Sequence, residues 1–134
     1  MLKPTGLLYI NAPSNGEFHR HPVDCWRFYP DSSVALQNWA RRSGHKCSLV
    51  ESFVGRRKKD QWNDFVAVFI KDDKYLGQYT NRIQDEYKIY MNGRRYNSDL
   101  IVNEMRRMVD IGQITLKRVR KKIKSTVKQI LLGK

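Results

Sequence analysis

Side chains that could take part in catalysis or ligand binding are concentrated between residues 11 and 27. The candidates are Asn11, Pro13, His19, His21, Asp24 and Arg27. Histidine can transfer a proton near neutral pH, and the planar guanidinium of arginine can bind a carboxylate or a phosphate. We therefore expect a substrate-side loop in this part of the chain. The alternative is an ordinary polar connection, in which Asp24 and Arg27 pair with each other.

The spacing His19-x-His21-x-x-x-Cys25 raises the question of a metal ion. Zinc needs three or four converging ligands, and His45 or Cys47 would have to complete the set. No CxxC or HxxxH motif accompanies the two histidines, so we predict no metal site. Because the chain has only 2 cysteines, a disulfide framework is also excluded.

Positive charge is the second chemical feature of the chain. There are 26 Lys and Arg against 13 Asp and Glu, a formal net charge of +13, and more than half of the excess lies in residues 98–134. We predict a basic surface formed by Arg56, Arg57, Lys58, Lys59, Lys117, Lys121 and Lys124. An amphipathic helix over residues 114–131 could bind nucleic acid, an acidic partner or an anionic membrane surface. The alternative is a solvated helix face whose apolar stripe packs on its own domain or in a dimer.

The elements that would position these residues follow from apolar runs and turn signals. We predict an α/β fold with strands at about 7–11, 47–54 and 64–71 and a helix at about 32–43. The run Leu-Leu-Tyr-Ile-Asn is typical of a strand buried on both faces inside a parallel sheet. The nine-residue connection between the last two strands favours an antiparallel hairpin.

Beyond residue 72 the composition changes. We expect residues 1–72 to form one unit and residues 73–134 a basic, mostly helical extension, with a first helix from Ser98 to about Ile111. The chain lacks the long apolar core of a signal peptide and any run that approaches a membrane span. A cytoplasmic location is therefore the expectation.

Three segments resemble class I S-adenosylmethionine-dependent methyltransferases. Leu2-Lys3-Pro4-Thr5-Gly6 is similar to the Leu-Lys-Pro-Gly-Gly turn before the fifth strand of that family, and residues 7–13 are similar to this strand and its exit. Residues 21–31 resemble the segment His-Pro-x-Asp-Tyr-Trp-Arg-Phe-Thr-Pro-Asp of one branch. The resemblance covers about residues 1–72 and only the C-terminal half of the family domain. It implies part of a Rossmann-like sheet, with strands in the order five–seven–six.

The resemblance implies S-adenosylmethionine as the cofactor, but the chain lacks the half that holds it. A glycine-rich turn and an acidic residue are needed there, and no G-x-G-x-x-G occurs in the sequence. We therefore expect a methyltransferase-like fragment or subunit that is inactive alone and binds no cofactor as an isolated chain. A noncatalytic basic module is the alternative from another class.

A missing fourth strand has a structural consequence. Strand 7–11 would then present a bare apolar edge, and such an edge invites pairing with another chain. We expect a second copy, residues 73–134 or a missing N-terminal half to cover it. An uncovered, solvated edge would count against the methyltransferase relationship.

Overall fold

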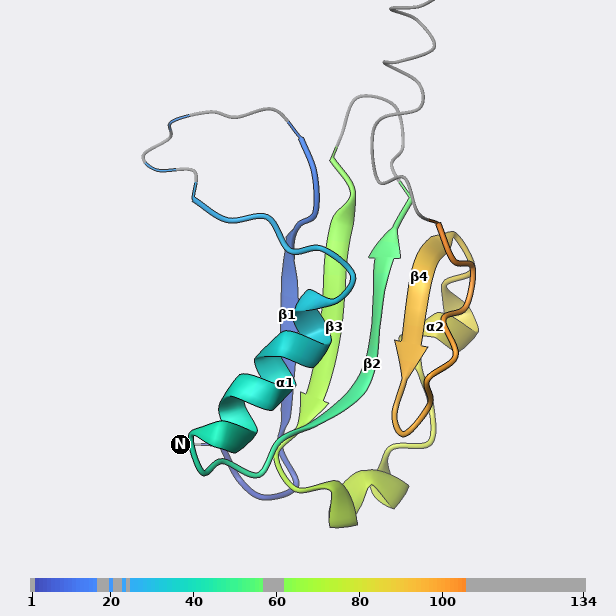
Figure 1. The fold of residues 1–134 in the computed structure, drawn as a ribbon. Helices are drawn as coiled ribbons and strands as arrows, with labels where there is room; N and C mark the ends of the chain where they lie inside the picture. The colour runs from blue at the N-terminus through green and yellow to red at the C-terminus, as the bar shows by residue number, and fades with distance from the viewer. Residues whose placement is uncertain (1, 17–19, 21–22, 24, 57–61, 106–134) are drawn as a thin grey trace, which may run out of the picture.

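The computed structural model describes residues 2–16, 20, 23, 25–56 and 62–105. They form a mixed α/β structure built on one four-stranded sheet (Figure 1). The elements are β1 (Leu7–Pro13), α1 (Ser32–Arg42), β2 (Ser48–Gly55), β3 (Asp64–Ile70), the 3-10 helix η1 (Asp73–Gln78), α2 (Ile83–Glu86) and β4 (Tyr90–Arg95). The strand order is β1-β3-β2-β4, and each neighbouring pair is antiparallel.

The central strand β3 supplies core residues to both faces of the sheet. Phe65, Ala67 and Phe69 alternate along it with Val66, Val68 and Ile70, and all six side chains are buried. The first set packs with Leu36 of α1, and Val68 and Ile70 of the second set pack with Tyr75 and Leu76 of η1. Because strand side chains alternate between faces, α1 and η1 cover opposite sides of one sheet.

Two predictions from the sequence are confirmed. Residues 48–55 and 64–70 form an antiparallel hairpin, and residues 32–42 form a helix. Gly44 ends that helix with φ +78, the left-handed conformation that glycine adopts without steric cost. At its other end the Asp31 side chain makes no capping hydrogen bond.

The prediction that residues 7–11 form an interior strand of a parallel sheet is wrong. β1 lies at the edge of the sheet and pairs antiparallel with β3, with Leu7 opposite Ile70 and Pro13 opposite Asp64. Leu8 and Tyr9 are 49% and 55% exposed. The apolar run predicts burial on both faces, but β1 is an edge strand whose residues are exposed or only half-buried.

Residues 73–105 are not the mostly helical extension that we predicted. They contain two short helices and the strand β4. Because β4 pairs with β2, it belongs to the same sheet as β1, β2 and β3. The helix expected from Ser98 does not begin there, because residues 98–105 have no helical structure and Val102 instead pairs with Gly93. The helix predicted over 114–131 lies outside the described residues.

Buried polar contacts hold β4 and α2 in place. The Glu51 carboxylate, 2% exposed, accepts hydrogen bonds from the backbone N–H groups of Ile83 and Gln84 at 2.8 and 3.1 Å. The Gln84 side chain in turn donates to the carbonyl of Arg94 in β4 at 2.8 Å. The Gln84 side chain of α2 therefore helps to fix β4, in addition to the burial of apolar residues.

Candidate functional site

The carboxyl end of β1 meets the beginning of β3, and the β1–β3 pairing continues beyond Pro13. The Ser14 N–H donates to the Asn63 carbonyl at 2.8 Å. The Asn63 N–H donates to the Asn15 side-chain oxygen at 2.6 Å. Asn15 and Asn63, which are 48 positions apart in sequence, are therefore held together at the end of β1. This is where we predicted a substrate-side loop.

Three buried polar atoms at this point have no hydrogen-bond partner among the described residues. They are the Ser14 hydroxyl, the Asn15 side-chain N–H₂ group and the Asn63 side-chain oxygen. Ser14 is fully buried and Asn63 is 6% exposed. A buried polar atom without a partner costs about 1–3 kcal/mol. The cluster contains a hydroxyl, a donor and an acceptor, and all three atoms are shielded from solvent.

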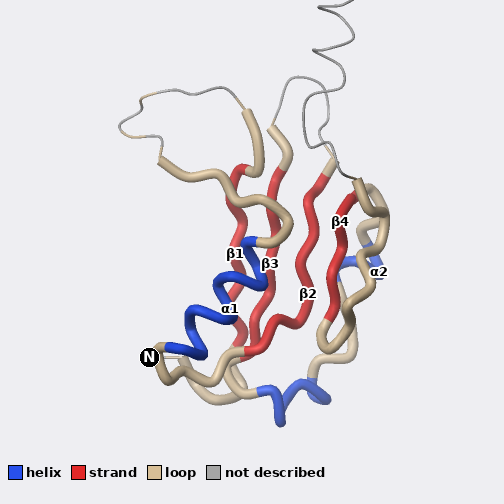
Figure 2. Tube along the Cα trace, viewed as in Figure 1, coloured by secondary structure: helices blue, strands red, loops and turns tan. Residues whose placement is uncertain are grey.

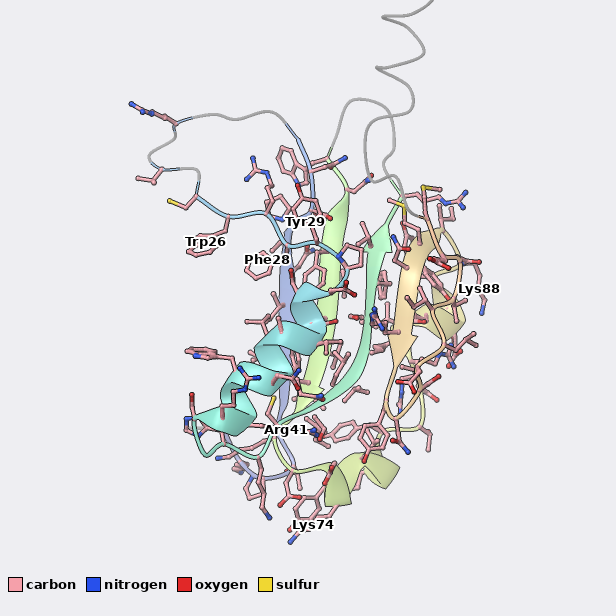
Figure 3. The ribbon with its side chains drawn as sticks, in the orientation of Figure 1. Trp26, Phe28, Tyr29, Arg41, Lys74 and Lys88 are labelled. Atoms are coloured by element: carbon pink, nitrogen blue, oxygen red, sulfur yellow. The ribbon has the colours of Figure 1, made fainter. Side chains whose placement is uncertain are left out.

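The segment that contains Arg27 passes beside the same end of β1. The Phe28 N–H donates to the Pro13 carbonyl at 3.0 Å, and the Phe28 ring stacks on Phe65 with centroids 5.7 Å apart. Phe28 lies on the approach to α1 (Figure 3). Half-buried Arg27 donates to the Trp26 carbonyl at 3.1 Å. The structure therefore brings Pro13 and the Arg27–Phe28 segment together.

The other predicted site residues are not all placed. Asn11 is an exposed residue of β1, two positions before Pro13. His19, His21 and Asp24 lie outside the described residues, so their part in the loop stays a prediction. Asn63 was missed, because its proximity to Ser14 depends on the register between β1 and β3.

The outer edge of β1 is a second functional feature. The Lys71 N–H donates to the Gly6 carbonyl at 3.1 Å, and Ser14 bonds to Asn63 as described above. In an antiparallel pair the backbone groups of alternate residues face the same neighbour. The backbone groups of Leu8, Ile10 and Ala12 therefore face β3, and those of Leu7, Tyr9 and Asn11 face outward. We call these three outward-facing residues the free edge.

A cavity of about 370 Å³ lies at the opposite end of the sheet, where α1 ends and β2 begins. Three of its polar side chains pair with one another: Arg41 donates to the Ser48 hydroxyl at 2.8 Å, and this hydroxyl donates to Asp73 at 3.1 Å. Burial raises the pKa of the Cys47 thiol, although Arg41 opposes the change. Arg41, Ser48 and Asp73 thus form a structural network at this end of the sheet.

Asp72 also lines this cavity. Burial would raise the pKa of the Asp72 carboxyl, but its hydrogen bonds to the Lys74 backbone and the Lys46 ammonium hold it below the usual value. Lys46 lies 3.3 Å from the carboxylate. Asp72 therefore stays ionised and caps the start of η1.

Little of the predicted basic surface can be located. Arg56 is exposed just after β2, and its backbone N–H donates to the Ile89 carbonyl at 3.0 Å. The remaining members lie outside the described residues: Arg57, Lys58, Lys59, Lys117, Lys121 and Lys124. A basic surface stays a prediction from composition.

In comparisons with known proteins, no family model, no curated protein and no solved structure matches the chain. Among the described residues, no helix has the length and apolar character needed to cross a bilayer. The same residues contain no group of three or more side chains that could bind a metal ion together.

Proposed function

We propose that this chain is a methyltransferase-like fragment or subunit that corresponds to the C-terminal half of the class I S-adenosylmethionine-dependent fold. The observation that supports it best is the order β1-β3-β2, in which β1 and β2 run in the same direction with β3 antiparallel between them. This is the five–seven–six order that the sequence resemblance implies. The connection from β1 to β2 through α1 agrees with it as well.

The edge of β1 bears on this proposal in two ways. A fourth strand would pair where Leu7, Tyr9 and Asn11 direct their backbone groups outward, so the position of the unpaired edge supports a missing half. Yet no described residue pairs with that edge, and this is the uncovered, solvated edge that we expected to count against the relationship. The proposal therefore requires a complementary half that supplies the strand.

The described residues alone do not fit the cofactor. The turn after β1 contains one glycine, Gly16, and the buried polar atoms beside it belong to a hydroxyl and two amides. Holding the cofactor needs close backbone approach and a carboxylate for the ribose hydroxyls. In this proposal the chain contributes the substrate side, at the end of β1 where Pro13 and Arg27 lie. Ser14, Asn15 and Asn63 hold the start of that loop through the hydrogen bonds described above.

Calorimetry tests the proposal. The isolated chain should give no binding heat with S-adenosylmethionine, whereas a mixture with the first half of a class I methyltransferase, ending after strand four, should form a complex that binds it. Tyr9→Lys should abolish the complex by placing a charge on the free edge, and Asn38→Lys on the exposed side of α1 should not. Tight binding by the isolated chain, or a complex insensitive to Tyr9→Lys, would overturn the proposal.

A noncatalytic basic module remains the second candidate, and the net charge of +13 is the observation that favours it. Fluorescence anisotropy with a labelled DNA duplex would show an affinity that falls steeply as salt is raised. Loss of liposome binding on deletion of residues 113–134 would instead indicate a membrane surface. An affinity for either polyanion that does not depend on salt would contradict this candidate.

A further inference from the structure

The free edge of β1 is closed at both of its ends by the chain itself. The Pro13 carbonyl accepts the Phe28 N–H at 3.0 Å, and proline has no N–H of its own. The Thr5 carbonyl accepts the Tyr79 hydroxyl at 2.7 Å. The available groups are therefore confined to Leu7, Tyr9 and Asn11, with Tyr9 at the centre.

This arrangement is self-complementary. A two-fold axis through Tyr9 places three residues of one molecule opposite three of the second: Leu7 opposite Asn11, Tyr9 opposite Tyr9, and Asn11 opposite Leu7. Each of these three pairs joins residues whose backbone groups face outward, so each can exchange two hydrogen bonds. Every N–H and carbonyl of the free edge then has a partner, which an interface between identical surfaces requires.

We propose that two copies of this chain associate through their β1 strands, antiparallel and centred on Tyr9, to form one continuous eight-stranded sheet. The inference does not rest on the methyltransferase proposal, since it needs only the free edge. The two do compete, because a fourth strand from a complementary half would use the same backbone groups.

The side chains of β1 favour a second copy as the occupant. Residues 7–13 contain no charged side chain that would repel its counterpart or blunt the edge. Leu7, Leu8 and Tyr9 are 37%, 49% and 55% exposed, so pairing also removes apolar surface from water. Because one strand pair is smaller than a standard interface, we expect half-association at roughly 10–500 μM.

The overall charge gives this dimer an unusual salt dependence. Two molecules that each carry +13 repel one another, and salt screens that repulsion. Association through β1 should therefore strengthen on raising the salt concentration. If a contaminating polyanion instead held two copies together, raising the salt concentration would separate them.

Disulfide trapping tests the register in the full chain. In a Cys25→Ser, Cys47→Ser background, Tyr9→Cys should crosslink two copies rapidly, because directly opposite residues of a hydrogen-bonded pair lie about 5.5 Å apart, within the range of a disulfide. Leu8→Cys is the matched control: it lies opposite Ile10 of the second copy and not opposite itself, so it should crosslink at least tenfold more slowly. Equal rates for the two variants would overturn the register.

Sedimentation equilibrium tests the association itself. The unmodified chain should pass from monomer to dimer over the expected concentration range, and Tyr9→Pro, which removes the central outward N–H, should stay monomeric with an unchanged circular dichroism spectrum. A chain that stays monomeric up to about 1 mM, twice the upper end of that range, would refute the proposal. Failure of this test leaves the calorimetric test of the methyltransferase proposal intact.

Discussion

The two edges of the sheet differ in how they are completed (Figure 2). At the β4 edge the chain folds back on itself: Gly93 and Val102 exchange two hydrogen bonds of 2.8 Å, and the Asn92 N–H donates to the Asn103 carbonyl at 3.1 Å. At the β1 edge the outward backbone groups of Leu7, Tyr9 and Asn11 have no partner among the described residues. One sheet thus has a self-closed edge and a free one.

The difference shows where this fold depends on another molecule. Unpaired backbone groups on an exposed strand are a template for an additional strand. The segment 98–105 removes that template beside β4, and the described part of the chain places no such segment beside β1. Substitutions at β4 should therefore change folding stability, whereas substitutions at β1 should change association.

The largest effect is expected from Gly93→Ala at the closed edge. An added methyl group would lie 2.6 Å from the Tyr90 ring and 2.8 Å from the Gln84 side-chain oxygen, and both residues are buried. We predict a loss of roughly 3 kcal/mol in the free energy of unfolding, at the upper end of overpacking effects. Urea denaturation measures it, with Gly77→Ala as the control because nothing lies within 4 Å of its added methyl. Equal stability of the two variants would show that the β4 edge is not tightly packed.

A smaller loss is expected from Asn92→Gly. The Asn92 side chain donates to the Met105 carbonyl at 3.1 Å and accepts from the Met105 N–H at 2.7 Å. Its φ is 53, which glycine tolerates, so the substitution removes these hydrogen bonds without adding backbone strain. We predict a loss of about 1–2 kcal/mol on urea denaturation. An unchanged midpoint would mean that this segment does not stabilise the β4 edge.

Tyr9→Lys should separate association from stability at the free edge. Because Tyr9 is 55% exposed, its replacement should alter the free energy of unfolding of the monomer by no more than about 0.5 kcal/mol. The same change should abolish pairing through β1. Thermal denaturation at low concentration and sedimentation at high concentration measure the two effects. A large destabilisation of the monomer would mean that β1 is packed more deeply than its edge position indicates.

The smallest effect concerns pH. A hydrogen bond from Arg95 in β4 holds the pKa of the Asp85 carboxyl in α2 below its usual value. A carboxyl whose pKa is lowered by folding stabilises the protein above its unfolded pKa of about 3.9, and the contribution disappears as the pH falls through the lower folded value. Asp85→Asn should therefore be slightly less stable at pH 7, and the difference should shrink as the pH falls below about 3.9. A difference that does not change with pH would assign the effect to something other than this ion pair.

The parts of the fold that could be predicted are those where local pattern and burial agree. The apolar run from Phe65 to Ile70 is buried at every position, and Gly44 ends α1. β4 was missed because its residues are largely polar and its position depends on Gln84 and Asp85, side chains that come from a separate helix. The helix from Ser98 was predicted from an apolar stripe, yet Leu100 of that stripe is 70% exposed.

The candidate site could be predicted only as a region. The end of an apolar strand located the loop around Pro13, and the residue types suggested polar chemistry there. Nothing in the spacing indicates that Asn63 joins Ser14, since that contact requires the β1–β3 register. An isolated apolar run also cannot distinguish an interior strand from an edge strand, because the distinction depends on which strands lie beside it.

Hydrogen exchange at β1, followed residue by residue by NMR, tests the central claim most directly. In dilute solution the amides of Leu7, Tyr9 and Asn11 should exchange quickly and those of Leu8, Ile10 and Ala12 slowly, because only the second set donates to β3. All six should become slow when a partner strand binds. Uniform protection of all six amides in the dilute chain would contradict a free edge at β1.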